Sequence, residues 1–244
     1  MTKAIVLLSG GVDSATCLGL ACDDFGAENV TAVSILYGQK HATELKCAEQ
    51  LAAYYGVTRK VIDLTEVMQF SDSPLLATSN LDIRHESYAE QIAKDGEGMV
   101  DTFVPFRNGL LLSTAAAVAM SIYPKQAVAI LYGAHADDAA GRAYPDCSPE
   151  FVNPMSEAIS AGSDGYLELI APLINSNKTA VIQMGLEIGV PYELTWSCYE
   201  GRDAACGSCA TCQDRLLAFE KNNMADPIVY EIDKAVILTE GGER

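Results

Sequence analysis

The chain has 244 residues, the size of one large domain, and its formal net charge of −17 at pH 7 excludes a standing basic surface for duplex or transfer RNA. Hydrophobic residues make up 49% and charged residues 20%, which excludes extended disorder and allows a sizeable core. No apolar run reaches the length of a signal-peptide core or a membrane span, so we expect a cytoplasmic protein without membrane contact.

Short apolar runs alternate with helical patterns along the chain. The pattern predicts strands at 4–8, 30–36, 61–64 and 127–132, a further apolar run from Leu167, and helices at 14–23, 41–55, 88–94, 109–122 and 178–188. This order predicts an α/β fold with a doubly wound parallel sheet and right-handed crossovers. Only the tail at 239–244 is expected to be disordered.

Loops that follow strands are where ligands bind in such sheets, and three loops stand out. They are residues 9–14, 134–149 and 64–108. The last is longer than a simple connection, so we expect part of it to cover a substrate.

The first of these loops reads Ser9-Gly10-Gly11-Val12-Asp13-Ser14 and lies between a predicted strand and a predicted helix. Glycines let the backbone approach a ligand closely, and a helix N-terminus presents free N–H groups to an anion, so the loop fits a phosphate. It is neither a Walker loop nor G-x-G-x-x-G. The alternative is a plain turn in which Asp13 or Ser14 caps the helix.

Four cysteines near the end of the chain have metal-ligand spacing: Cys198, Cys206, Cys209 and Cys212. In a reducing compartment this pattern predicts a four-thiolate structural Zn²⁺ site in place of disulfides. An iron–sulfur cluster uses the same ligands, and a redox dithiol needs only one C-x-x-C pair. The remaining cysteines are expected in the core at Cys17, Cys22 and Cys47, with Cys147 in a candidate site loop as a structural or a reactive thiol.

The run at 9–14 resembles the S-G-G-x-D-S loop of the PP-loop ATP pyrophosphatase superfamily, whose members cleave ATP between its α and β phosphates. Segments 103–108, 133–138, 144–151 and 189–199 are similar, in the same order, to signature segments of the 7-cyano-7-deazaguanine synthase family. The chain has Ala205 where that family often has a histidine, and the loop at 137–142 varies among members, which leaves His135 and Arg142 without an assigned role.

The resemblance implies a Rossmann-like fold of the adenine nucleotide alpha hydrolase type, with an ATP-binding domain at 1–196 and a zinc-binding lobe and tail at 197–244 in the same compact unit. It also implies ATP-dependent conversion of 7-carboxy-7-deazaguanine and ammonia into a nitrile, and a homodimer. The chain leaves no length for a glutaminase domain, so free ammonia is the expected nitrogen source.

The resemblance carries residue roles. Asp13, Ser14, Arg107 and Lys178 are expected in catalysis, Asp13 with Mg²⁺ and the two cations with the departing pyrophosphate. Nucleotide contacts are expected from Leu8, Ser9, Gly10, Gly11, Val12, Asp13, Ser14, Ala15, Thr16, Cys17 and Leu18. Substrate contacts are expected from Phe106, Asn108 and Asp146, where Asp146 accepts hydrogen bonds from a guanine-like edge or caps the turn at Tyr144-Pro145.

Two other functions fit the same loop. One is a PP-loop enzyme that modifies transfer RNA, a sulfur transferase or a lysidine synthase, which the acidic balance disfavours. The other is a non-catalytic nucleotide-binding protein with a zinc lobe.

Overall fold

The computed structural model describes residues 1–40, 43–201 and 203–231. Its centre is a five-stranded parallel sheet in the order β3-β2-β1-β4-β5. The strands are β1 (Lys3–Leu7), β2 (Val30–Leu36), β3 (Thr58–Asp63), β4 (Val128–Leu131) and β5 (Leu167–Ile170). The chain winds outward from β1 to β3 and then returns to the other side of β1, so the strand order reverses between β1 and β4. The crevice outside the carboxyl ends of these two strands is the expected ligand site.

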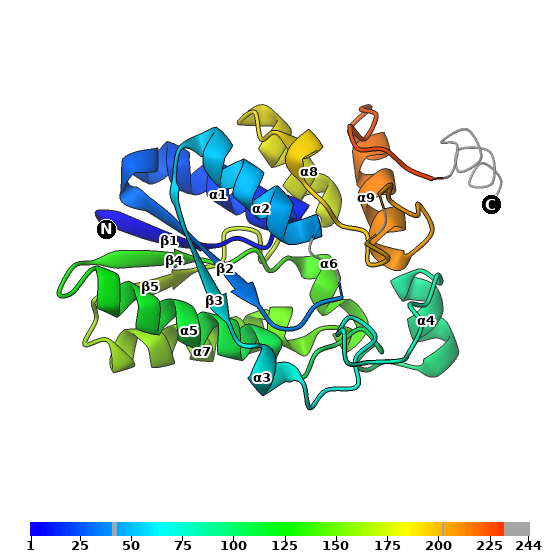
Figure 1. Cartoon of the computed structure of the whole chain (residues 1–244), viewed down its shortest axis with the longest axis horizontal. Helices are drawn as coiled ribbons and strands as arrows, with labels where there is room; N and C mark the ends of the chain where they lie inside the picture. The colour runs from blue at the N-terminus through cyan, green and yellow to red at the C-terminus, as the bar shows by residue number, and fades with distance from the viewer. Residues whose placement is uncertain (41–42, 202, 232–244) are drawn as a thin grey trace.

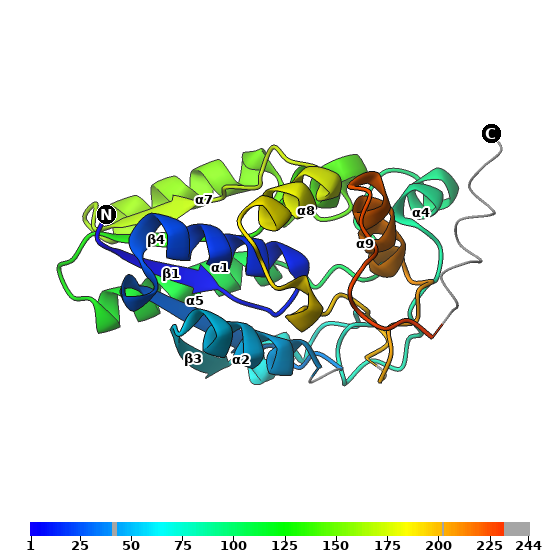
Figure 2. The ribbon, with the colours of Figure 1, turned by 90° about the horizontal axis from the view of Figure 1, so that it is seen from above.

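Helices cover both faces of the sheet (Figures 1 and 2). One face carries α1 (Val12–Phe25), α2 (Thr43–Tyr55) and α8 (Lys178–Glu187), and the other carries α5 (Arg107–Ile122) and α7 (Pro149–Gly162). Strand β1 is buried on both sides: Ala4 and Val6 join the core with α1, whereas Ile5 and Leu7 join the core with α5. The predicted doubly wound α/β fold is confirmed.

Four further α-helices lie in the described part of the chain. They are α3 (Thr65–Met68), α4 (Tyr88–Asp95), α6 (Ala136–Ala139) and α9 (Ala210–Lys221). Helix α9 packs against α8, and its Ala218 and Phe219 enter the core that α1 shares with the sheet. The cysteine-rich segment is thereby continuous with the main body of the protein. No helix of the described residues is long and apolar enough to cross a membrane.

The predicted elements differ from the observed ones mainly at the sheet edge and in four helices that were not predicted, α3, α6, α7 and α9. Strand β3 begins at Thr58, ahead of the predicted 61, because its edge position leaves Thr58, Lys60 and Val61 exposed and hides the apolar signal. Helix α7 contains Pro154, a residue that normally argues against a helix interior. Helix α9 was missed among the cysteines. Positions 41–42 of the predicted helix at 41–55 and the tail at 239–244 lie outside the described residues.

Candidate active site

The phosphate loop, residues 9–14, joins β1 to α1 at the point where the strand order reverses. Gly10 has φ of +102°, and a Cβ there would lie 2.0 Å from the main-chain oxygen of Glu44. The Ser14 hydroxyl accepts the N–H groups of Ser9 and Gly10 at 3.2 and 3.3 Å and donates to the Gly11 carbonyl at 3.0 Å. The loop is therefore a tight turn whose N–H groups gather at the N-terminus of α1, where the helix dipole favours an anion.

A cleft of about 250 Å³ opens at this loop. The predicted nucleotide contacts that line it are Leu8, Ser9, Gly11, Val12, Asp13 and Ser14. Gly10 packs against α2 instead. The other four predicted residues, Ala15, Thr16, Cys17 and Leu18, are fully enclosed in the core and do not line the cleft. The helix beyond Ser14 supports the loop from behind.

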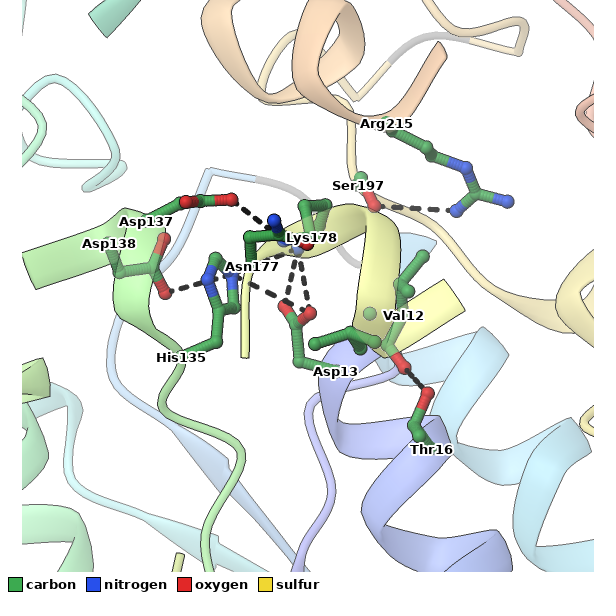
Figure 3. A network of polar contacts seen from close by, with 12 residues as sticks. Val12, Asp13, Thr16, His135, Asp137, Asp138, Asn177, Lys178, Ser197 and Arg215 are labelled. Carbon is green, nitrogen blue, oxygen red and sulfur yellow. Dashed lines mark hydrogen bonds and ion pairs between the residues drawn. The ribbon is translucent and has the colours of Figure 1, made fainter. Parts of the chain in front are cut away.

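Charged side chains from three segments meet beside the phosphate loop (Figure 3). Lys178 Nζ, in the first turn of α8, donates to both carboxylate oxygens of Asp13 at 2.7 Å. His135 Nε2 lies 3.2 Å from that Nζ, 3.6 Å from Asp13 Oδ1 and 3.3 Å from Asp138 Oδ2. Asp137 accepts the main-chain N–H of Lys178 at 2.7 Å and so fixes the start of α8. The sheet thus brings the predicted Asp13 and Lys178 together across the crevice.

The Asp13–Lys178 pair is held in its charged form. Burial alone would raise the pKa of Asp13, but the charges of Lys178 and His135 outweigh it and leave that pKa below its ordinary value. Burial likewise opposes the charge of Lys178, yet Asp13 and Asp138 raise its pKa. Burial raises the pKa of Asp138, and raises that of Asp214 on α9 to about 6. Lys178 therefore supplies the positive charge that balances the neighbouring carboxylates of Asp13, Asp138 and Asp214.

A second group of cleft residues surrounds Arg107, at the start of α5. Its Nη1 donates to the Tyr37 hydroxyl at 3.3 Å, and the guanidinium lies 5.2 Å from the Tyr37 ring centroid. Glu44 also lines the cleft, and burial raises its pKa to about 7 even though the charge of Arg107 opposes this. Asn108 Nδ2 donates to the Cys147 sulfur at 3.3 Å, and both residues line the cleft. These residues therefore offer the cleft a cation, an amide and a carboxyl of high pKa.

A cluster of tyrosine hydroxyls lies at the side of the cleft. The Tyr88 hydroxyl is 2.8 Å from that of Tyr199 and 3.1 Å from that of Tyr144, which also contacts Thr102 at 2.5 Å. Tyr88 belongs to the long segment at 64–108, Tyr144 to the loop at 134–149, and Tyr199 to the cysteine-rich segment. Because Tyr88 and Tyr199 line the cleft, the cluster joins these three segments at its wall.

The four cysteines predicted to bind metal converge in the structure. The sulfurs of Cys198, Cys206, Cys209 and Cys212 all lie within 4.8 Å of one another, and all four residues are buried. A tetrahedral ion with bonds of about 2.3 Å holds its sulfurs about 3.8 Å apart, so the set fits one such ion. Cys206 Sγ also accepts the main-chain N–H groups of Ser208 and Cys209 at 3.4 and 3.3 Å, as a thiolate would.

Comparisons with known proteins agree with this arrangement. The family described as queuosine biosynthesis protein QueC matches residues 3–223, a range that holds the phosphate loop and all four cysteines. The 7-cyano-7-deazaguanine synthase 1 of Colwellia psychrerythraea is 42% identical over 94% of this chain and 99% of its own length. The 7-cyano-7-deazaguanine synthase of Thermoplasma acidophilum is also 42% identical, over 94% of this chain and 92% of its own. The chain belongs to this family. Among solved structures, an NMN synthetase from Francisella tularensis aligns with a TM-score of 0.48 and 15% identity over 97% of this chain and 81% of that chain.

The resemblance to 7-cyano-7-deazaguanine synthases that the sequence motifs indicated is thus confirmed, and the chain is a C–N bond-forming enzyme of that family. Two of its predicted substrate residues, however, do not line the cleft. Phe106 is 61% exposed, and its ring packs edge-on against Phe151 with centroids 5.9 Å apart. Asp146 is buried, and its Oδ2 accepts the main-chain N–H of Asn108 at 3.0 Å. This carboxylate caps the first turn of α5 through Oδ2, and its buried Oδ1 has no hydrogen-bond partner among the described residues.

Several cleft residues of this synthase were missed by sequence reasoning. Tyr37 and Glu44 follow the end of β2, and the rule that ligands bind beyond strand ends would have found Tyr37. His135 and Asp138 lie in a segment that was singled out, but no role was assigned to them. Tyr88 and Tyr199 are 111 positions apart, and no local pattern relates them.

Proposed function

We propose that this cleft converts 7-carboxy-7-deazaguanine, ammonia and ATP into 7-cyano-7-deazaguanine, the nitrile after which the related enzymes are named. One observation supports this most strongly. A phosphate loop, at a helix N-terminus and beside a partly buried lysine, opens into a cleft that is also lined by an arginine and an amide.

The chemistry requires two activations. A carboxylate is a poor electrophile because its leaving group would be oxide. Its oxygen attacks the α phosphorus of ATP, pyrophosphate leaves, and the acyl adenylate then loses AMP to ammonia to form an amide. The amide oxygen attacks a second ATP in the same way, and loss of AMP and a proton leaves the nitrile.

In this proposal the residues of the phosphate loop hold the outer phosphates through their N–H groups and the Ser14 hydroxyl. Lys178 then gives up its hydrogen bonds to Asp13 and binds the departing pyrophosphate, since a triphosphate brings more negative charge than one carboxylate. Asp13, relieved of its lysine, becomes free to help place Mg²⁺.

Arg107 and Asn108 are the proposed partners of the carboxylate substrate. The planar guanidinium suits a carboxylate and is oriented by stacking against Tyr37. Asp146 acts through Asn108, because it fixes the backbone of that residue. The segment at 64–108, joined to the cysteine-rich segment through Tyr88 and Tyr199, excludes water from the two activated intermediates.

Zn²⁺ is the proposed occupant of the cysteine site, in a structural role. The short sulfur separations favour a single ion over a cluster of several irons, which would need more room between the sulfurs. We propose that the boundary between the ATP-binding part and the zinc lobe lies between residues 196 and 197. A cytoplasmic homodimer completes the proposal, and light scattering on the purified protein tests the dimer.

The decisive experiment is to incubate purified protein with the carboxylate, ammonium and Mg²⁺–ATP and to follow nitrile, AMP and pyrophosphate by mass spectrometry. Nitrile with matched AMP and pyrophosphate supports the proposal. Absence of nitrile at every ammonium concentration rejects it. The transfer RNA alternative is not favoured by the comparisons, and tight, salt-sensitive RNA retention on a filter would restore it.

A further inference from the structure

The phosphate loop and the cysteine site are joined by a short segment, residues 195–199, which we call the strap. The Trp196 main-chain N–H donates to the Gly10 carbonyl at 2.9 Å. The Trp196 indole N–H donates to the carbonyl of Cys198 at 2.9 Å. One residue therefore holds the phosphate loop with its backbone and the first metal ligand with its side chain. Trp196, Ser197, Cys198 and Tyr199 also line the cleft, so the strap forms part of its wall.

Arg215 fixes the strap on both sides of Trp196. This arginine is fully buried, on α9, three positions after the ligand Cys212. Its Nη1 donates to the hydroxyls of Thr195 and Ser197 at 2.8 and 3.3 Å, and Figure 3 shows the second of these contacts. Its Nε and Nη2 donate to the two carboxylate oxygens of Asp226 at 2.7 and 3.1 Å. A buried guanidinium held this way has little freedom to move.

We propose that Arg215 is a positioning residue for ATP binding, and that metal at the cysteine site acts on the phosphate loop through it. Coordination of Cys209 and Cys212 fixes the start of α9, Arg215 fixes the strap, and Trp196 fixes the Gly10 carbonyl. The N–H groups of the phosphate loop are then oriented before the nucleotide arrives, so binding does not have to order them. This inference rests on the proposed function, because it assumes that the loop binds ATP.

The test separates positioning from simple stabilisation of the lobe. Thr195→Val removes one hydrogen-bond acceptor of Arg215, at a buried residue that does not line the cleft. Arg215→Lys keeps the positive charge but loses the several N–H donors of the guanidinium. Tyr230→Phe is the matched control. It removes the hydroxyl that donates to Asp226 at 2.6 Å and leaves the strap contacts in place. The dissociation constant of Mg²⁺–ATP is measured by calorimetry, together with metal content by elemental analysis and folding by circular dichroism.

We expect Thr195→Val and Arg215→Lys to weaken ATP binding about tenfold, or 1.4 kcal/mol, with full metal content, and Tyr230→Phe to change it less than about twofold. Chelation of the metal should weaken ATP binding in the wild-type protein, and added Zn²⁺ should restore it there but not in Arg215→Lys. Folded, metal-replete strap variants with wild-type ATP affinity would overturn the inference. If Arg215→Lys does not fold, the ATP dissociation constant and metal content of Thr195→Val decide the inference. A wild-type protein that binds no ATP would instead sink the proposed function.

Discussion

Gly10→Ala is the sharpest test of how the phosphate loop is packed. The new Cβ would lie 2.0 Å from the Glu44 oxygen and 2.9 Å from the Ala48 nitrogen, both main-chain atoms of α2. A backbone with positive φ costs an L side chain about 1–2 kcal/mol, and forcing a methyl group into packed backbone costs about 1–3 kcal/mol. The free energy of unfolding should therefore fall by about 2–5 kcal/mol. At about 2–4 °C per kcal/mol for a chain of this size, Tm should fall by about 4–20 °C.

The measurements are urea unfolding and calorimetric titration with Mg²⁺–ATP. If the loop shifts to relieve the clash, part of the loss appears as weaker ATP binding. Gly11→Ala is the control for stability: Gly11 has φ of −82°, and its Cβ would stand 3.5 Å from its nearest neighbours, an ordinary contact. Equal unfolding free energies and equal ATP affinities for Gly10→Ala and the wild-type protein would refute the reasoning.

Three further predictions concern the charged groups and the metal. Lys178→Met should lower the rate of pyrophosphate release about 100- to 1,000-fold in a coupled assay, because it removes the cation that meets the leaving group; a loss below about threefold would contradict that role. Cys209→Ser should lower both metal content and Tm, and a variant that keeps one metal per chain would argue against Cys209 as a ligand. Burial raises the pKa of Glu44 to about 7, so the folded protein favours the protonated carboxyl. The resulting contribution to the free energy of unfolding is fully present below about pH 4.3 and is lost as the pH rises through 7. The stability of Glu44→Gln relative to the wild-type protein should therefore increase from pH 5 to pH 8 in urea titrations, and a difference that does not change with pH would show the shift to be absent.

Local patterns predicted the parts of this protein that depend on neighbouring residues in the chain. The phosphate loop needs two adjacent glycines before a helix, and the metal site needs cysteines at short spacing, so both were visible in the sequence. The order of elements was enough to predict the parallel sheet. Lys178 could be proposed, but its bond to Asp13 depends on how α1 and α8 pack against each other.

Contacts that depend on tertiary packing could not be predicted from local patterns. Asp146 lies in a segment typical of the family, yet the approach of α5 directs its carboxylate to the N–H of Asn108. Phe106 lies next to two cleft residues in the sequence. Its backbone is left-handed, with φ of +54°, and its ring packs on Phe151. The contacts of Arg215 could not be foreseen, because a charged residue at full burial is rare and its partners come from two separate segments, 192–197 and Asp226.

Trp196 is the single tryptophan of the chain. Since its indole touches the segment that carries Cys198 and its backbone touches Gly10, its intrinsic fluorescence reports on both places without a label. Stopped-flow traces of nucleotide mixing and of metal removal would then arise from one emitter, and their rates can be compared directly in the unmodified protein.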